Sequence, residues 1–358
     1  MKKTRERPIE ILVVDDSAVV RQFMAALLED QSDMQVETAA DPLIAIRKLQ
    51  KQRPDVILLD LEMPRMDGLT FLREEVMAKD PIPVVIFSSH AGRGTELAVR
   101  ALEAGAVQIR DKSKIGLGNF LEKSATTILD TLRAAADAHP LASRPPTRQT
   151  GGATASTLPA EPSLTLTSEK VVAIGASAGG TEALRQILEM LPVTIPGFVV
   201  VQHMPQFFTA TFAHRLDQLC AMEVREAKDG DRVSPGVALI APGDRHLRVV
   251  RSSSGYRVEI YDGELVCRHR PSVDVLFKSV AKTVGPNGIG ILLTGMGADG
   301  ADGLLEMRQA GSVTVAQDEA SCVVFGMPKR AIEKGAAEHI APPWKIAKML
   351  LGSAGEDG

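Results

Sequence analysis

The sequence predicts an α/β protein of two doubly wound parallel-sheet domains joined by a flexible linker. Three observations lead to this fold class. Short apolar segments that favour strands alternate with segments whose apolar residues recur at helical spacing. Several of these strands end directly at an acid, a serine or a histidine. A stretch rich in proline, glycine, serine and threonine separates two such series, and 358 residues suffice for two domains with adequate cores.

The first series places polar residues at the ends of three strands. The strand at residues 9–14 ends at Asp15 and Asp16, the strand at 56–59 ends at Asp60, and the strand at 84–87 ends at Ser88. Between the first two strands, a helix has its inner face marked by Val20, Phe23, Met24 and Leu27. Because the carboxyl ends of parallel strands share one edge of a sheet, we expect these polar side chains to meet.

The acids at this edge form the first candidate site. Carboxylates brought together repel one another, so keeping them all ionised requires a cation, and hard oxygen ligands suit Mg²⁺. The alternative is that the aspartates simply cap the following helices. Capping explains Asp15 or Asp16 singly, but it poorly explains three acids that share an edge with a hydroxyl and a lysine, Lys112.

Residues 9–132 resemble the receiver domain of bacterial response regulators. The matching motifs are Asp15-Asp16-Ser17, the stretch from Leu59 to Gly68, Ser88-Ser89 and Lys112. The resemblance implies that Asp60 takes a phosphoryl group from a phosphohistidine on a sensor histidine kinase and becomes an acyl phosphate. It implies that Asp16 and Asp60 hold Mg²⁺ together with the Glu62 carbonyl, and that Asp15 helps through water. Ser88 would then bond to the phosphoryl oxygen and Lys112 would pair with it.

Two positions depart from the receiver pattern. Ser113 stands where a proline usually follows the lysine, and Ile109 stands at the family's aromatic switch position. The first departure bears on a cis peptide that aims the lysine, and the second bears on aromatic gating. We expect phosphoryl chemistry to survive both.

Residues 133–169 form the predicted linker. After a short helical continuation, proline, glycine, serine, threonine and alanine dominate, and no aromatic residue is present. Such a composition does not offset the entropy of ordering, so we expect a flexible, partly extended tether. A tether of this length permits two arrangements of the flanking domains.

The second series again ends strands at chemically active residues. An apolar strand from Val171 runs into a glycine-rich turn that holds Ser177, the strand at 198–202 delivers His203, and the strand at 289–293 leads to Asp299. Apolar residues at helical spacing follow in three places: Leu184, Ile187, Leu188 and Leu191; Phe208, Phe212, Leu216 and Leu219; and Val273, Leu276, Phe277 and Val280. Segments 237–241, 246–251 and 256–261 suggest an antiparallel addition.

Ser177, His203 and Asp299 are the candidate catalytic residues. They share one sheet edge if the sheet is parallel, so a serine, a histidine and an acid can meet although they are distant in sequence. Each also has an ordinary explanation: the glycine turn can cradle an anion with Ser177 as a helix cap, His203 can be a loop residue, and Asp299 can cap a helix. The nucleotide-binding fingerprints and the calcium loop both fail on spacing.

Residues 170–352 resemble the catalytic domain of the chemotaxis-type protein-glutamate methylesterases. The matching motifs are residues 175–183, 202–204, 212–217, 270–277 and 293–300. The resemblance implies hydrolysis of glutamyl methyl esters on chemoreceptors, deamidation of glutamines, and an oxyanion held by the Met296 N–H. It implies no cofactor for the esterase reaction. Ala178 departs from the family, which often has threonine there.

The composition argues against a nucleic-acid-binding, a secreted or a membrane-spanning protein. A net charge of −4 and a pI near 6.0 provide no general attraction to nucleic acid. Three distant cysteines indicate a reducing compartment, and neither a signal peptide nor an apolar run of membrane-spanning length is present. We therefore expect a cytoplasmic monomer without direct membrane insertion. Arg215, His269 and Arg270 could face substrate, although solvated charges are the commoner case.

The sequence allows two hypotheses for the function of the whole chain. In the first, the unphosphorylated receiver packs over the Ser177 edge, and phosphorylation of Asp60 shifts the population toward an open, active enzyme. In the second, the chain is a phosphorylation-gated binding protein whose glycine turn holds an anion and catalyses nothing.

Overall fold

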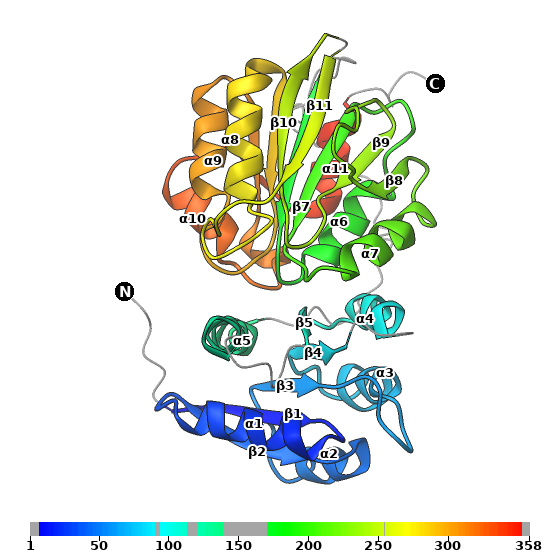
Figure 1. Ribbon diagram of the computed structural model, residues 1–358, viewed down its shortest axis with the longest axis vertical. Helices are drawn as coiled ribbons and strands as arrows, with labels where there is room; N and C mark the ends of the chain where they lie inside the picture. The colour runs from blue at the N-terminus through cyan, green and yellow to red at the C-terminus, as the bar shows by residue number, and fades with distance from the viewer. Residues whose placement is uncertain (1–6, 90–93, 113–120, 139–169, 254, 353–358) are drawn as a thin grey trace, which may run out of the picture.

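The computed structural model describes residues 7–89, 94–112, 121–138, 170–253 and 255–352. Ser113 and residues 139–169 of the predicted linker lie outside this range. The described chain forms two α/β domains, each with its own parallel sheet, as predicted (Figure 1). No helix within the described ranges is long and apolar enough to cross a membrane.

The first domain has a five-stranded parallel sheet in the order β2-β1-β3-β4-β5. Its strands are β1 (Ile9–Val14), β2 (Met34–Ala39), β3 (Val56–Leu59), β4 (Val84–Ser88) and β5 (Gln108–Asp111). The helices between and after them are α1 (Ala18–Glu29), α2 (Pro42–Leu49), α3 (Gly68–Thr70), which continues as the π-helical segment η1 (Phe71–Met77), α4 (Gly94–Glu103) and α5 (Leu121–Ala136). The strand order reverses beside β1, so the ligand site expected of such a sheet lies beyond the carboxyl ends of β1 and β3.

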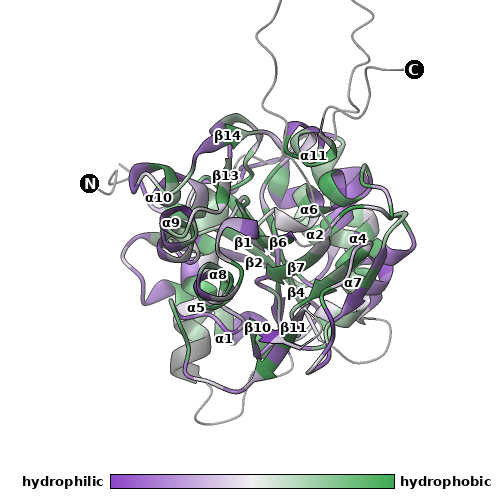
Figure 2. Cartoon of the chain, turned by 90° about the horizontal axis from the view of Figure 1, so that it is seen from above, coloured by the Kyte–Doolittle hydropathy of each residue, from purple (hydrophilic) through white to green (hydrophobic). Residues whose placement is uncertain are grey.

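The second domain has a seven-stranded parallel sheet in the order β14-β13-β12-β6-β7-β9-β8. Its strands are β6 (Val171–Ala176), β7 (Gly197–Gln202), β8 (Glu223–Glu226), β9 (Val237–Ile240), β12 (Gly288–Leu292), β13 (Val313–Gln317) and β14 (His339–Ala341). Its helices are α6 (Gly180–Leu188), α7 (Phe208–Asp217), α8 (Val273–Thr283), η3 (Gly285–Asn287), α9 (Ala301–Gln309), η4 (Glu319–Ser321), α10 (Met327–Glu333) and α11 (Pro343–Leu351). Figure 2 shows apolar strands β6 and β7 in the interior.

The predicted antiparallel addition is smaller than expected. Strands β10 (His246–Ser252) and β11 (Gly255–Tyr261) do form an antiparallel pair. The prediction was wrong for residues 237–241, because β9 lies in the large sheet and runs parallel to both β7 and β8. Ala238, Leu239 and Ile240 are all fully buried. Such a continuous apolar run is typical of a parallel strand covered on both faces, and no alternation is present to support a hairpin.

One element of the first domain also differs from the sequence expectations. Strand β2 was not predicted, because it is an edge strand in which the exposed residues Gln35 and Glu37 interrupt the apolar pattern. The missed strand reflects a solvent-facing side that weakens the periodic signal. On α1, Val20 and Met24 are buried, and Phe23 and Leu27 are partly buried and pack against the same apolar cluster, which confirms the predicted inner face.

Glycine is required where the sheet of the second domain meets α8. A Cβ built at Gly175 on β6 would lie 2.1 Å from Val273 Cγ1, and Val273 is fully buried at the start of α8. Only a residue without a side chain allows α8 to approach the sheet this closely. The same approach brings the first turn of α8 to the sheet edge that carries the candidate catalytic residues.

We therefore expect Gly175→Ala to lower the free energy of unfolding by about 1–3 kcal/mol, since the added methyl overpacks a dense core. Denaturant unfolding measures the change. A double variant with Val273→Ala should lose less than the sum of the single variants, because Val273→Ala removes the methyl that clashes. Strict additivity of the two losses would contradict this contact.

Candidate active site

Ser177 and His203 follow neighbouring strands in register. Ala176 of β6 pairs with Gln202 of β7, so the two strands end side by side. The His203 N–H donates to the Ala176 carbonyl over 3.0 Å, and the Ser177 N–H donates to the Thr294 carbonyl over 3.0 Å. The Gln202 side-chain amide donates to the Ser177 carbonyl over 2.8 Å. The ends of β6, β7 and β12 are therefore tied together, as the parallel sheet predicted.

His203 and Asp299 are directly hydrogen-bonded. His203 Nε2 lies 2.8 Å from Asp299 Oδ2, and both side chains are buried. Burial alone would raise the pKa of Asp299, but the bond and the charge of His203 outweigh it and lower the pKa to about 2. Asp299 is therefore ionised near neutral pH and must accept the hydrogen bond. The Nε2 atom carries the proton, which leaves Nδ1 of a neutral ring as the basic nitrogen.

The Asp299 carboxylate also holds the start of α8. Its Oδ1 accepts from the Ser272 hydroxyl over 2.7 Å and from the Asp274 N–H over 3.0 Å, and its Oδ2 accepts from the Val273 N–H over 2.7 Å. Together with the His203 ring N–H, four donors therefore bond to the two carboxylate oxygens of Asp299. A carboxylate has about four lone-pair positions, so the network satisfies it fully.

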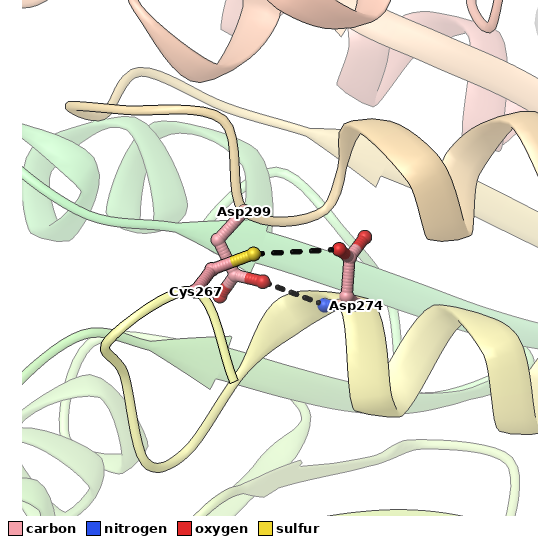
Figure 3. Close-up of side chains that lie close together, drawn as sticks. All are labelled: Cys267, Asp274 and Asp299. Atoms are coloured by element: carbon pink, nitrogen blue, oxygen red, sulfur yellow. Dashed lines mark hydrogen bonds between the residues drawn. The ribbon is translucent and has the colours of Figure 1, made fainter. Parts of the chain in front are cut away.

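Cys267, Asp274 and Asp299 lie close together (Figure 3). The hydrogen bonds of Asp299 bear on whether this cluster can hold a metal ion. Their ligand atoms lie within 4.8 Å of one another, which is compatible with a metal site. The Asp299 oxygens, however, have no lone pair left for a metal. The Cys267 thiol donates to Asp274 over 3.7 Å, and burial together with the nearby carboxylates raises its pKa to about 11. The cluster is structural.

The hydroxyl of Ser177 has no hydrogen bond to His203, although both residues are described. Ser177 is 3% exposed and lies in the turn between β6 and α6. The His203 Nδ1 atom is buried and has no hydrogen-bond partner in the described chain. Catalytic hydrogen bonds are often long before substrate binds. The arrangement leaves one free hydroxyl and one free basic nitrogen on adjacent strand ends.

Met296 follows the end of β12 and lies beside the serine turn. A Cβ built on its neighbour Gly295 would meet Ser177 Cβ at 2.7 Å, so the two turns are in close contact. Within the described residues the Met296 N–H forms no backbone or side-chain hydrogen bond. It is available to donate to a group bound at Ser177.

Three further residues from the sequence analysis have specific contacts. Arg215 on α7 pairs with Glu103 of the first domain over 2.6 Å, and Arg270 pairs with Asp244 over 2.8 Å. His269 lies with its ring stacked on that of His203. Ser272 lies within the motif of residues 270–277, but no role was predicted for it. Nothing in that motif reveals that its hydroxyl bonds to a distant aspartate.

The acidic edge of the first domain assembles as predicted. Carboxylate oxygens of Asp15, Asp16 and Asp60 lie within 4.8 Å of one another. Lys112 Nζ bridges Asp15 and Asp60 at 2.8 and 2.6 Å. Burial raises the pKa of Asp15, even though Lys112 opposes that shift. Three carboxylates with a single lysine remain short of positive charge, so the donor set fits a hard divalent cation such as Mg²⁺.

Glu62 and Ser88 also lie at this edge. The Glu62 N–H donates to Asp60 Oδ1 over 3.4 Å, so the Glu62 backbone approaches the acidic cluster, while its side chain is exposed and accepts from Ser89. Ser88 is fully buried at the end of β4, and its carbonyl accepts from the Lys112 N–H over 2.9 Å. Ile109, at the aromatic switch position, is buried in the apolar core.

The first domain covers the serine edge of the second (Figure 1). The Val107 carbonyl, just before edge strand β5, accepts from the Gly179 N–H in the serine turn over 2.9 Å. Asp130 on α5 pairs with Arg268 over 2.5 Å, next to His269. A cavity of about 290 Å³ between the domains is lined by residues of both, among them Arg110, Ile128, His203 and His269. The first domain therefore contacts the serine turn and forms one side of the candidate active site.

Comparisons with known proteins cover almost the whole chain. Residues 172–350 match the family model described as CheB methylesterase, and residues 11–115 match the response regulator receiver domain. A relative from Anaeromyxobacter dehalogenans, named protein-glutamate methylesterase/protein-glutamine glutaminase 5, is 54% identical and covers 97% of each chain. One from Geobacter metallireducens, with the same name and the number 3, is 52% identical and covers 96% of this chain and 99% of its own.

A solved structure agrees with the fold of the second domain. The crystal structure of the Thermotoga maritima CheB methylesterase catalytic domain is 40% identical, with a TM-score of 0.51. The match covers 52% of this chain and 98% of that one.

The bonding of Asp299 leads to a stability prediction. Asp299→Asn places an amide N–H₂ against buried donors, so we expect a loss of about 2–4 kcal/mol in the free energy of unfolding of the second domain. Denaturant unfolding of the full chain tests this. The control is Asp302→Asn, an exposed acid in the first turn of α9, which should change stability by less than about 0.5 kcal/mol. Equal small effects of both substitutions would refute the structural role of the network.

Proposed function

The chain belongs to the CheB methylesterase family, and on this premise we propose that it hydrolyses glutamyl methyl esters and deamidates glutamines on chemoreceptors, with Ser177, His203 and Asp299 as the catalytic residues. We propose further that phosphorylation of Asp60 activates it. The observation that carries the proposal is the buried His203–Asp299 hydrogen bond, which leaves a free basic nitrogen beside the Ser177 turn. We place the reaction in the cytoplasm, with a monomeric enzyme that needs neither nucleic acid nor membrane insertion.

In the proposed mechanism Ser177 Oγ attacks the γ-carbonyl carbon of the ester while His203 Nδ1 takes the hydroxyl proton. Ionised Asp299 stabilises the resulting imidazolium through Nε2–H. The tetrahedral intermediate expels methanol, whose oxygen receives that proton from Nδ1, and an acyl-serine remains. Water then attacks the acyl carbon while Nδ1 takes its proton. The bond from the acyl carbon to Ser177 Oγ breaks, Oγ regains a proton from Nδ1, and glutamate is released. A glutamine substrate follows the same path and releases ammonia.

The Met296 N–H supplies the proposed oxyanion donor. It is unused by the described chain and lies in the turn packed against Ser177. Losing a single such donor typically costs an enzyme roughly 3 kcal/mol of transition-state stabilisation. The Gly179 N–H is a second donor of the serine turn, but in this arrangement the Val107 carbonyl occupies it.

The proposed control begins at the acidic edge of the receiver, which we assign to residues 9–132, with 133–169 as linker and 170–352 as catalytic domain. Asp16, Asp60 and the Glu62 carbonyl would hold Mg²⁺, with Asp15 acting through water, and the ion would neutralise charge on the phosphoryl group. A sensor histidine kinase would donate that group to Asp60. Lys112 would pair with the phosphoryl oxygens and Ser88 would bond to one of them.

Strand β5 and its flanks connect this edge to the catalytic domain. Lys112 directly follows β5 and holds Asp60, while Val107 directly precedes it and holds Gly179. A phosphoryl group on Asp60 competes for Lys112, which biases β5 and its neighbours toward a second position. Release of the Val107–Gly179 bond would then uncover the site. With the receiver docked, Ser177 is only 3% exposed, so a receptor side chain could not reach it.

The first test of function is methanol release from methylated receptor. Ser177→Ala should lower the rate roughly a thousandfold or more, because no other group at the site can form the acyl intermediate. Ser253→Ala, an exposed serine in the β10–β11 turn, is the control and should leave the rate unchanged. Equal activity of Ser177→Ala and the parent protein would refute the mechanism. Absence of methanol release from the phosphorylated parent would instead favour a non-enzymatic binding protein.

The second test concerns the docked receiver. Glu103→Lys sets two positive charges together at the α4–α7 contact, where Glu103 now pairs with Arg215. We expect the unphosphorylated protein to become about fivefold more active, equivalent to roughly 1 kcal/mol against docking. Glu96→Lys, an exposed site on the same helix, is the matched control.

A charge swap sharpens this test. Combining Glu103→Arg with Arg215→Glu should restore low basal activity, because the ion pair re-forms with reversed sign. A shortened protein beginning near Glu169 should be more active than the unphosphorylated full chain. If it is no more active, the receiver does not inhibit the enzyme.

A further inference from the structure

The imidazole of His269 lies flat against the imidazole of His203. The ring centroids are 3.7 Å apart and the ring planes differ by 9°. His269 comes from the loop between β11 and α8, far from the strand that delivers His203. A tight turn fixes its backbone: the His269 N–H donates to the Val266 carbonyl over 2.8 Å, and the Val266 N–H donates to the His269 carbonyl over 3.1 Å. The stack is therefore held by the loop's own hydrogen bonds.

The stack restrains a motion that the hydrogen bond to Asp299 leaves free. A single bond at Nε2 anchors one edge of the His203 ring but still allows the ring to tilt about that contact. Because Nδ1 has no partner in the described chain, nothing else at the reactive edge sets the ring plane. A second ring against the face removes the tilt and fixes the direction in which Nδ1 points.

His269 is suited to this place because it stays uncharged. Burial lowers its pKa first, and the charges of His203, Arg110 and Arg268 lower it further against the opposing effect of Asp299, to about 2. These are the charged groups that act on it from the catalytic strands, the receiver and its own loop. A neutral ring presents a π face to its neighbour, and such a face attracts a cation. A protonated His269 would instead repel the imidazolium.

We propose that His269 is a positioning residue for the ester hydrolysis: its neutral ring holds the His203 imidazole in its reactive plane and stabilises the imidazolium that forms during reaction. This inference rests on the proposed Ser/His/Asp mechanism. It assigns His269 no contact with the substrate, and it differs from the interpretation of this residue as a solvated or substrate-facing charge.

The test compares two substitutions in the full chain, phosphorylated with Mg²⁺ and a small acyl phosphate. His269→Phe keeps a flat ring without a titratable nitrogen, and His269→Leu keeps apolar bulk without a ring. Methanol release from membranes that carry methyl-labelled receptor measures kcat and KM. Aromatic pairs are worth about 0.5–1.5 kcal/mol beyond burial, so His269→Leu should lower kcat about three- to tenfold with KM nearly unchanged. His269→Phe should stay within about twofold of the parent.

The division of the loss between kcat and KM separates positioning from a merely structural role. Without the stacked ring, the His203 imidazole can tilt away from its reactive orientation, which slows proton transfer and leaves substrate binding unchanged. The loss should therefore fall on kcat and not on KM in His269→Leu, and both should stay within about twofold of the parent in His269→Phe. Thermal unfolding checks that both variants fold. If His269→Leu does not fold, His269→Gln replaces it, with the same expected loss.

Two results would overturn the proposal. The first is a His269→Leu protein, or its Gln substitute, with the parent kcat. The second is a His269→Phe protein that loses as much activity as the variant without a ring, because the ring nitrogens would then matter and the stack would not. Ser177→Ala is assayed alongside. Its retention of activity would instead show that the proposed mechanism is wrong.

Discussion

The carboxylate of Asp299 is the constraint on which the second domain's active edge depends. Its two oxygens accept hydrogen bonds from the His203 ring, the Ser272 hydroxyl and two N–H groups that open α8. One buried charge therefore joins the turn after β12, the end of β7 and the start of α8. Because every acceptor position is used, the charge is compensated within the fold and requires no ion.

The same bonds explain the chemistry assigned to His203. The ionised acid fixes the proton on Nε2, and this makes Nδ1 the basic nitrogen of the neutral ring, as the proposed mechanism requires. The close approach of α8, which Gly175 allows, brings the donors of Ser272 and Val273 within reach of the acid. Packing at the centre of the domain and proton placement at its edge are consequences of the same geometry.

The contact between the domains is built differently. It combines a backbone hydrogen bond from Gly179 to Val107 with partly exposed ion pairs, Arg215–Glu103 and Arg268–Asp130. Exposed ion pairs contribute little stability, and contacts between domains in one chain commonly allow movement. Apolar side chains of α4 and α7 add to the contact. An interface of many small contributions suits the proposed displacement of the receiver by a phosphoryl group.

Periodicity and strand ends alone predicted two parallel-sheet domains and the residues that share each sheet edge, including Ser177, His203 and Asp299. These features are local, because a buried strand and the residue after it are encoded in a few consecutive positions. Whether a strand lies at the edge of a sheet, and with which strand it pairs, depends on distant parts of the chain. Strand β2 escaped prediction because its solvent-facing residues dilute the apolar pattern, and β9 was misassigned because four apolar residues do not reveal their partner.

Only the tertiary structure decided the finer chemistry. No local pattern states that Asp299 bonds to Ser272, that Nδ1 of His203 is the free nitrogen, that His269 stacks on His203, or that Val107 occupies the Gly179 donor. Each depends on distances between segments separated by tens of residues, and these distances arise from how helices and loops pack on the sheet. The sequence by itself thus determined which chemical groups reach the edge, while packing determined how they are oriented and bonded there.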